Sequence, residues 1–227
     1  MKQKFTILFD LDGTLVDTAP DLMLAHNHVM KKFGYPTKST EDIRNLVGKG
    51  AGALIGRSIW GQAKKEFSKV LDEKIKDEMV KEFINFYGKN INNESTLVTG
   101  VKSFLIWCKE QNISMAVCTN KQEHLSNDLL KKIGIYDFFE YVAGSDTFDY
   151  CKPDPRHLTN VVEILDGDVK KTIMIGDSET DANAAKAAEI PVILLENGYT
   201  EKNTTEIYHN HLIKDFIGIE EIITKYL

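Results

Sequence analysis

The stretch that decides the fold is Phe5-Thr6-Ile7-Leu8-Phe9-Asp10-Leu11-Asp12-Gly13-Thr14. Its first five residues are apolar or β-branched, which predicts a short strand that is buried on both faces. Two carboxylates, Asp10 and Asp12, follow the strand at once. Like charges this close raise each other's pKa unless a cation lies among them. The end of this strand is therefore a candidate site of chemistry.

The rest of the chain alternates between short apolar runs and helical patterns. This βαβα order predicts an α/β, Rossmann-like doubly wound fold with a mainly parallel sheet and helices on both faces. We expect strands at Phe5–Phe9, Ser114–Cys118, Tyr141–Ala143, Thr172–Ile175 and Val192–Leu195. We expect helices at Val101–Gln111, Glu123–Ile133, Pro155–Leu165, Asp181–Ala188 and Phe216–Tyr226.

One interval between the first strand and Val101 lacks a strand pattern and is helical throughout. It is too long for a loop inside a compact domain and too apolar for a linker. We therefore predict a core domain of residues 1–17 and 96–227 and an inserted helical cap domain of residues 18–95. The expected cap helices are Asp21–Phe33, Thr40–Leu46, Ala51–Ile59 and Gln62–Asn90. Their apolar positions include Leu22, Ala25, Val29, Phe33, Phe67, Val70, Leu71, Ile75, Met79, Phe83 and Phe86.

Composition narrows the classes of protein to consider. The 227 residues carry a formal net charge of -6, which argues against nucleic acid as a partner. No apolar run is long enough for a membrane span, and we see no signal-peptide pattern. Three cysteines without metal-like spacing are expected to be reduced thiols. We therefore expect a cytoplasmic protein, either a monomer or a homodimer.

Polar residues follow several of the expected strands, at the edge where open α/β sheets bind ligands. They are Asp10, Asp12, Thr119, Asn120, Lys152, Asp177 and Asp181. Carboxylates without histidine or cysteine favour a hard cation such as Mg²⁺, which also binds substrate phosphate oxygens. A lysine in such an acidic pocket suits a phosphate oxygen. This set predicts a Mg²⁺-dependent site for a small phosphorylated substrate.

Together these motifs resemble the haloacid dehalogenase superfamily. The resemblance rests on Asp10-Leu-Asp12-Gly13-Thr14, Thr119-Asn120, Lys152-Pro153 and Gly176-Asp177-Ser178-Glu179-Thr180-Asp181, and the inserted helices resemble the small helical cap of that family. Within the family, Thr119-Asn120-Lys121, Gly48-Lys49-Gly50 and Thr99-Gly100-Val101 are most similar to phosphoglycolate phosphatase-like enzymes.

The resemblance implies a role for each motif residue. Asp10 is expected to attack phosphorus and form an aspartyl-phosphate, and Asp12 to act as general acid and then as general base. The Asp10 carboxylate, the Asp12 main-chain carbonyl and Asp177 are the expected Mg²⁺ ligands. Lys152 and Thr119 are expected to bind phosphoryl oxygens, with Asn120 nearby, and Asp181 to support the metal site or Lys152.

Two features leave alternatives open. The segment Gly48-Lys49-Gly50 is either an interhelical turn or a cap loop that reaches into the site, where Lys49 would meet a substrate carboxylate; Arg44 and Arg57 are alternative anion-binding residues. The activity expected first is hydrolysis of 2-phosphoglycolate. The rivals are a phosphosugar mutase, a pyrophosphatase or nucleotidase, and a non-enzymatic phosphate-sensing protein on the same scaffold.

Overall fold

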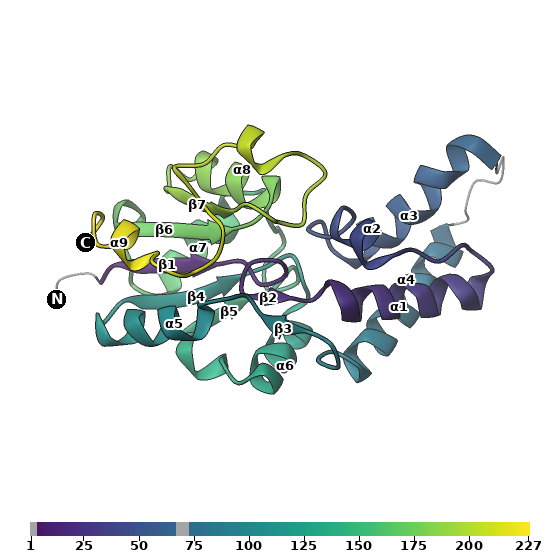
Figure 1. The fold of residues 1–227 in the computed structure, drawn as a ribbon, viewed down its shortest axis with the longest axis horizontal. Helices are drawn as coiled ribbons and strands as arrows, with labels where there is room; N and C mark the ends of the chain where they lie inside the picture. Colours follow the sequence, from purple (N-terminus) through teal and green to yellow (C-terminus); the bar gives the residue numbers. More distant parts are fainter. Residues whose placement is uncertain (1–3, 67–72) are drawn as a thin grey trace.

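The computed structural model describes residues 4–66 and 73–227, and a six-stranded sheet forms the centre of this part of the chain (Figure 1). The strand order is β5-β4-β1-β6-β7-β8 and every pairing is parallel. The strands are β1 Thr6–Phe9, β4 Ser114–Cys118, β5 Tyr141–Ala143, β6 Thr172–Gly176, β7 Val192–Leu195 and β8 His211–Ile213. The predicted α/β fold is confirmed, and β8 is a strand that the sequence did not predict.

Both faces of the sheet are buried, which explains the continuous apolar runs of its strands. Ile7 and Phe9 of β1 belong to one hydrophobic cluster with residues of α5 and α6, while Leu8 belongs to a second cluster with residues of α7 and α8. Figure 1 shows α5 and α8 on opposite sides of the sheet. These helices are α5 Val101–Glu110, α6 Glu123–Ile133, α7 Arg156–Ile164 and α8 Glu179–Ala187. The short 3₁₀ helices are η1 Tyr136–Phe138, η2 Val169–Lys171 and η3 Thr204–Glu206.

The last helix is shorter than predicted. The sequence predicted a helix at Phe216–Tyr226, but α9 covers only Glu220–Ile223. The carboxylate of Asp215 accepts a hydrogen bond from the amide of Ile217 at 2.8 Å, and Gly218 has a φ of 79°. A side-chain-capped turn and a left-handed residue therefore interrupt the apolar pattern before a longer helix can form.

Within the described residues, four helices are inserted between two short strands, β2 Val16–Asp17 and β3 Thr96–Leu97. They are α1 Ala19–Phe33, α2 Thr40–Arg44, α3 Ala51–Glu66 and α4 Glu73–Lys89. Figure 1 shows them gathered beyond one end of the sheet, with the start of the described chain and the C-terminus at the opposite end. The predicted break between Ile59 and Gln62 was wrong, because α3 continues through both positions.

The apolar stripe predicted for the inserted helices is partly confirmed. Leu22, Met79 and Phe83 are buried, whereas Ile75 is exposed, contrary to prediction. Three further predicted positions, Phe67, Val70 and Leu71, lie outside the described residues.

The inserted segment begins and ends at one place. Strand β2 pairs with β3 in antiparallel register, with Val16 opposite Leu97. At the start of α1, the buried carboxylate of Asp21 accepts hydrogen bonds from the amides of Asn93, Glu94 and Ser95 at 2.9–3.2 Å. A carboxylate that accepts several backbone bonds is a strong local constraint, so Asp21 ties the returning chain to its point of departure.

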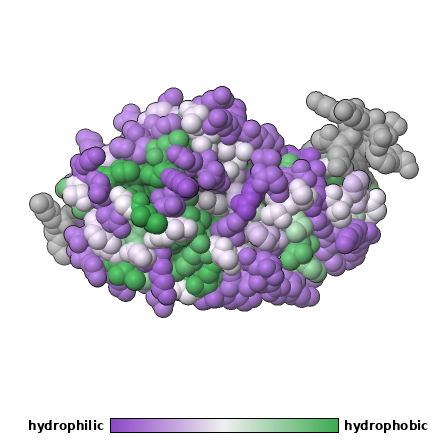
Figure 2. Space-filling model, viewed as in Figure 1, coloured by the Kyte–Doolittle hydropathy of each residue, from purple (hydrophilic) through white to green (hydrophobic). Residues whose placement is uncertain are grey.

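The surface differs between the two parts of the molecule. On the face drawn in Figure 2, hydrophilic residues cover most of the inserted helices, and the larger apolar patches lie over the part that contains the sheet. Within residues 4–66 and 73–227, no helix combines the length and the hydropathy that crossing a membrane requires.

We predict that Asp21→Ala destabilises the protein by about 2–4 kcal/mol, because several backbone amides lose a charged acceptor. The midpoint of thermal unfolding should fall by roughly 5–10 °C, and Asp21→Asn, which keeps one acceptor oxygen, should lose less. Asp77→Ala, at an exposed acidic position of α4, is the control and should change little. Equal midpoints for Asp21→Ala and the control would contradict the anchoring role.

Candidate active site

Polar residues from three adjacent strands meet beyond the carboxyl ends of the sheet. Strands β4, β1 and β6 are neighbours, and they are followed by Thr119, Asp10 and Asp177 respectively. The Asp10 amide donates to the Ile175 carbonyl at 2.9 Å and so continues the β1–β6 ladder by one residue. The parallel register therefore brings these three predicted site residues to one edge.

Lys152 lies at the centre of the site. Its Nζ is 2.8 Å from Asp10 Oδ1 and 2.6 Å from Asp181 Oδ1, and the residue is 3% exposed. Burial alone would lower the pKa of this ammonium, but the charges of Asp10 and Asp181 raise the pKa above its usual range. Lys152 is thus a permanent cation that fixes one oxygen of Asp10.

The neighbouring carboxylates can carry more negative charge than the single positive charge of Lys152 neutralises. Asp10, Asp177 and Asp181 each place one oxygen within 4.8 Å of the others. Burial raises the pKa of Asp10 to about 6, a rise that Lys152 opposes and Asp181 increases. Burial, followed by the charges of Asp10 and Asp181, raises the pKa of Asp177 well above its ordinary value. The excess negative charge is what a bound cation would relieve.

Asp181 serves to position its neighbours. Its Oδ1 binds Lys152, and its Oδ2 accepts hydrogen bonds from the amides of Asp177 and Ser178 at 3.1 and 3.0 Å and from Ser178 Oγ at 2.7 Å. Both oxygens are therefore engaged at the N-terminus of α8, where a carboxylate is favourable. Within the described residues, the oxygens of this cluster that have no partner are one of Asp10 and one of Asp177.

Two glycines allow the backbone to pass close to Asp177. Its Oδ2 accepts a hydrogen bond from the Tyr199 amide at 2.6 Å. A Cβ at Gly13, which has a φ of 84°, would lie 2.1 Å from Asp177 Oδ2, and one at Gly198 would lie 1.9 Å from the Asp177 carbonyl oxygen. Sequence reasoning missed Gly198, although Asn197-Gly198 is a turn signal after β7.

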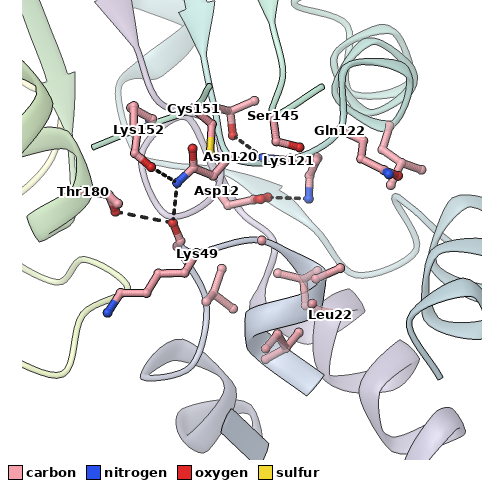
Figure 3. A pocket seen from close by; sticks show the side chains of 18 of the residues that line it. Asp12, Leu22, Lys49, Asn120, Lys121, Gln122, Ser145, Cys151, Lys152 and Thr180 are labelled. Carbon is pink, nitrogen blue, oxygen red and sulfur yellow. Dashed lines mark hydrogen bonds and ion pairs between the residues drawn. The ribbon is translucent and has the colours of Figure 1, made fainter. Parts of the chain in front are cut away.

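Asp12 lines the same cavity as Asp10. Its Oδ1 accepts a hydrogen bond from Thr18 Oγ1 at 2.7 Å and lies 2.8 Å from Lys121 Nζ. Figure 3 shows the Asp12 and Lys121 side chains pointing toward each other. Within the described residues, no hydrogen-bond donor engages the second oxygen of Asp12.

Asn120 joins the two halves of the site. Its Nδ2 donates to the Lys152 carbonyl at 2.9 Å and to the Gly48 carbonyl at 3.0 Å. Thr180 Oγ1 also approaches the Gly48 carbonyl, at 3.4 Å, while Thr119 Oγ1 accepts the Lys121 amide at 3.2 Å. The structure thus brings Gly48 of the inserted segment against the sheet edge.

The ammonium of Lys49 does not join this cluster. Lys49 is exposed, and Figure 3 shows its side chain extending away from Asp12. The two alternative arginines are engaged elsewhere: Arg44 Nη2 lies 2.7 Å from Asp17 Oδ2, and Arg57 pairs with Glu201.

Sequence reasoning missed a second buried lysine and its partner. Lys121 Nζ donates to the hydroxyl of Tyr87 on α4 at 3.0 Å, and both residues line the cavity. The position of Lys121 directly after Thr119-Asn120 was a usable signal, because the whole segment follows β4. Tyr87 carried no such signal, since only the packing of α4 brings it to the site.

The cavity between the sheet edge and the inserted helices has a volume of about 290 Å³. Asp10, Asp12, Thr119 and Asn120 line it on the sheet side. The inserted helices contribute mainly apolar walls, among them Leu22, Leu54, Val80, Phe83 and Ile84. This volume is at the small end of the range for ligand pockets. The site therefore suits a small molecule whose charged end meets the polar wall of the cavity and whose remainder lies against the apolar wall.

The donor set fits a magnesium ion. The free oxygens of Asp10 and Asp177 accept no hydrogen bond from any described residue, and Mg²⁺ is commonly held by one or two carboxylates together with waters and phosphate oxygens. Within the described residues, four site carboxylates, Asp10, Asp12, Asp177 and Asp181, face two buried ammonium groups, Lys121 and Lys152. A divalent cation would balance that difference.

Two sequence relatives resemble this chain over most of its length. A protein named phosphoglycolate phosphatase from Mesorhizobium japonicum is 37% identical over 210 residues, which cover 92% of this chain and 90% of the relative. One of the same name from Caulobacter vibrioides is 38% identical over 214 residues, 94% of this chain and 88% of the relative.

Solved structures agree with the fold. The crystal structure of a predicted phosphoglycolate phosphatase from Haemophilus somnus has a TM-score of 0.90 at 31% identity and covers 98% of this chain and 99% of its own. A β-phosphoglucomutase from Clostridium difficile has a TM-score of 0.78 at 23% identity, covers 98% and 97% of the two chains, and shares the fold alone. The family model described as haloacid dehalogenase-like hydrolase matches residues 7–195, and the chain belongs to that family.

Proposed function

We propose that this protein is a Mg²⁺-dependent phosphatase that hydrolyses a small phosphomonoester through a covalent intermediate on Asp10, and that 2-phosphoglycolate is its substrate. One observation carries the chemistry: a carboxylate held by a buried lysine lies in a small cavity beside a second carboxylate, Asp12. The names of the relatives support the choice of substrate. We further propose that residues 18–95 act as a cap domain over a core of residues 1–17 and 96–227.

The first half of the reaction is a transfer to Asp10. Lys152 holds Asp10 Oδ1 at 2.8 Å and so orients the carboxylate, one oxygen of which attacks phosphorus while the bond from phosphorus to the ester oxygen breaks. Asp12 donates its proton to that leaving oxygen, so that an alcohol rather than an alkoxide departs. The product of this step is an aspartyl-phosphate, a known outcome of carboxylate catalysis.

The second half returns Asp10 to its free form. Asp12, now a carboxylate, takes a proton from a water molecule as that water attacks the phosphorus of the aspartyl-phosphate. The bond between phosphorus and the Asp10 oxygen breaks, and inorganic phosphate leaves. The hydrogen bond from Thr18 Oγ1 at 2.7 Å orients the Asp12 carboxyl for both proton transfers.

The carboxylates of Asp10 and Asp177 and the main-chain carbonyl of Asp12 would hold the magnesium ion. When bound, Mg²⁺ supplies positive charge that offsets the repulsion between the anionic nucleophile and the anionic phosphate. Lys152 supplies a second positive charge to the transferring phosphoryl group. Thr119 binds a phosphoryl oxygen, and Asp181 keeps Lys152 in place through the contact of 2.6 Å.

The inserted helices exclude water from the reaction. Asn120 links the Gly48 carbonyl to the sheet edge, and apolar side chains close the opposite wall of the cavity. Water exclusion strengthens the charge interactions in the site and favours transfer to Asp10 over side reactions. In this proposal Gly48 and Asn120 shape the substrate site. A contact between Lys49 and a substrate carboxylate stays a prediction.

We predict that Asp10→Asn lowers kcat at least ~10³-fold, because the amide is a poor nucleophile, while the circular dichroism spectrum stays that of the wild type. Release of phosphate from 2-phosphoglycolate and from p-nitrophenyl phosphate is the measurement. Asp137→Asn, at an exposed position of η1, is the matched control and should keep full activity. Undiminished turnover by Asp10→Asn would refute the mechanism.

The same assay separates the rival activities. A mutase would isomerise a hexose phosphate with little release of phosphate, and a pyrophosphatase or nucleotidase would prefer those substrates in a panel of small phosphates. A non-enzymatic protein would release no phosphate from p-nitrophenyl phosphate with Mg²⁺ present.

A second prediction concerns stability in the absence of metal. In EDTA at pH 8, Asp177→Asn should be more stable than the wild type by about 1 kcal/mol, or ~2–4 °C in the unfolding midpoint. The pKa of Asp177 is raised in the folded protein, so folding disfavours its charged form, and Asn can still accept the Tyr199 amide. The difference should shrink as the pH falls and the buried carboxyls take up protons, including Asp10 with its pKa of about 6.

Magnesium should make the wild type more stable than Asp177→Asn, the reverse of the order in EDTA. At a concentration 100 times its dissociation constant, a ligand of the folded state stabilises by about 2.7 kcal/mol. The wild-type midpoint should therefore rise with Mg²⁺ at pH 8, and the Asp177→Asn midpoint should rise much less. A wild-type midpoint that does not respond to Mg²⁺ would contradict the metal site.

A further inference from the structure

Three lysines of the described chain line the cavity, and they differ in what holds them. Lys152 lies between two carboxylates. Lys49 is exposed, and its side chain extends away from Asp12 (Figure 3). The side chain of Lys121 is 5% exposed and has one carboxylate partner, Asp12. Among these three, Lys121 is thus the buried lysine whose positive charge is matched by a single carboxylate of the described residues.

Lys121 and Tyr87 together present two free donors. Of the three N–H bonds of Lys121, one faces Asp12 Oδ1 at 2.8 Å and one is donated to the Tyr87 oxygen at 3.0 Å. No described residue accepts the third. The Tyr87 oxygen acts as an acceptor in this bond, so its own proton remains available, and no described acceptor takes it. Tyr87 is 1% exposed, so both donors can be satisfied only from within the cavity.

These donors lie within reach of the leaving group. In the proposed reaction Asp12 contacts the ester oxygen, and Lys121 Nζ is 2.8 Å from Asp12. A carboxylate on the carbon next to that oxygen would therefore meet Lys121 and Tyr87, one oxygen to each. The nearby walls include Leu22, Phe83 and Leu125, and an apolar surround strengthens an ion pair that forms there.

We propose that Lys121 and Tyr87 recognise a carboxylate of the substrate and so make the enzyme selective for phosphate esters of 2-hydroxy acids. The inference rests on the proposed phosphatase function and assigns to Lys121 the role that the sequence suggested for Lys49. Lys121 follows β4 of the sheet and Tyr87 belongs to α4 of the inserted segment, so the bound carboxylate bridges the two parts of the molecule.

The test compares two esters that differ only at the recognised group. One is 2-phosphoglycolate, and the other is 2-hydroxyethyl phosphate, in which a hydroxymethyl group replaces the carboxylate. The measured quantity is the ratio of kcat/KM for the first ester to that for the second. Lys121→Met should lower this ratio at least ~10-fold, mainly by raising KM for 2-phosphoglycolate, because the loss of a charged donor falls on that ester alone.

Further variants distinguish a loss of carboxylate recognition from a general loss of folded structure. Lys121→Arg keeps the charge and should retain part of the selectivity. Tyr87→Phe removes only the hydroxyl and should lower the ratio several-fold. Lys132→Met, the same substitution at an exposed position of α6, should leave the ratio unchanged, and thermal unfolding should show that each variant is folded.

Calorimetry in the Asp10→Asn background adds a readout without turnover. The Lys121→Met change should weaken binding of 2-phosphoglycolate more than binding of 2-hydroxyethyl phosphate. Equal losses for both esters, in turnover and in binding, would overturn the assignment, as would a fall in the ratio for Lys49→Met with none for Lys121→Met.

The measurements distinguish a failure of the proposed carboxylate site from a failure of the proposed phosphatase function. If the wild type hydrolyses both esters equally well, the carboxylate site is refuted and the phosphatase chemistry stands. If it hydrolyses neither, the proposed function fails, and the binding comparison still decides whether Lys121 recognises a carboxylate.

Discussion

The buried contact of Lys152 with Asp10 and Asp181 is the interaction on which the rest of the site depends. A lysine that is 3% exposed stays charged only because two carboxylates lie within 2.8 Å of it. Removing one partner of such a group leaves an uncompensated buried charge, which costs several kcal/mol. The ion pair therefore fixes the orientation of Asp10, and through Asp181 it also fixes the first turn of α8 and the backbone around Asp177.

The contacts across the cavity depend on the position of the loop that carries Lys152. Asn120 donates to the carbonyl of Lys152 on one side and to the carbonyl of Gly48 on the other. The side-chain amide of Asn120 thus links the inserted segment directly to the loop that carries Lys152. The cavity is polar on the side of the sheet and mainly apolar on the side of the helices, so its polar wall and its apolar wall come from different parts of the chain.

Local signals were sufficient for five of the six strands of the sheet that the structure describes and for several polar residues at its edge. The strands β1, β4 and β6 are continuous apolar runs, and each is followed directly by polar residues, so Asp10, Thr119 and Asp177 were found without any knowledge of packing. Very short elements gave no signal: β2 and β3 contain two residues each. Residue roles that depend on distant contacts were also hidden, as for Tyr87, whose partner Lys121 is 34 positions away.

The helix boundaries show a similar limit. Apolar spacing placed a helix at Phe216–Tyr226, but a polar side chain at Asp215 and a left-handed Gly218 favour turns over most of that range. For Asp21, its position in the first turn of α1 concealed its role, because acidic residues are ordinary there. Its burial and its bonds to residues 93–95 became visible only in the folded chain.

The pairing of β2 with β3 has an evolutionary consequence. Since the chain leaves the sheet and returns to it through adjacent positions, Val16 and Leu97, whatever is inserted between them leaves the strand order and register untouched. The helices can accordingly be lengthened, replaced or redecorated as an exchangeable module, while the polar residues at the sheet edge keep their places. Because Tyr87 of α4 forms one half of the proposed carboxylate site, altered helices would also alter which substrates the cavity accepts.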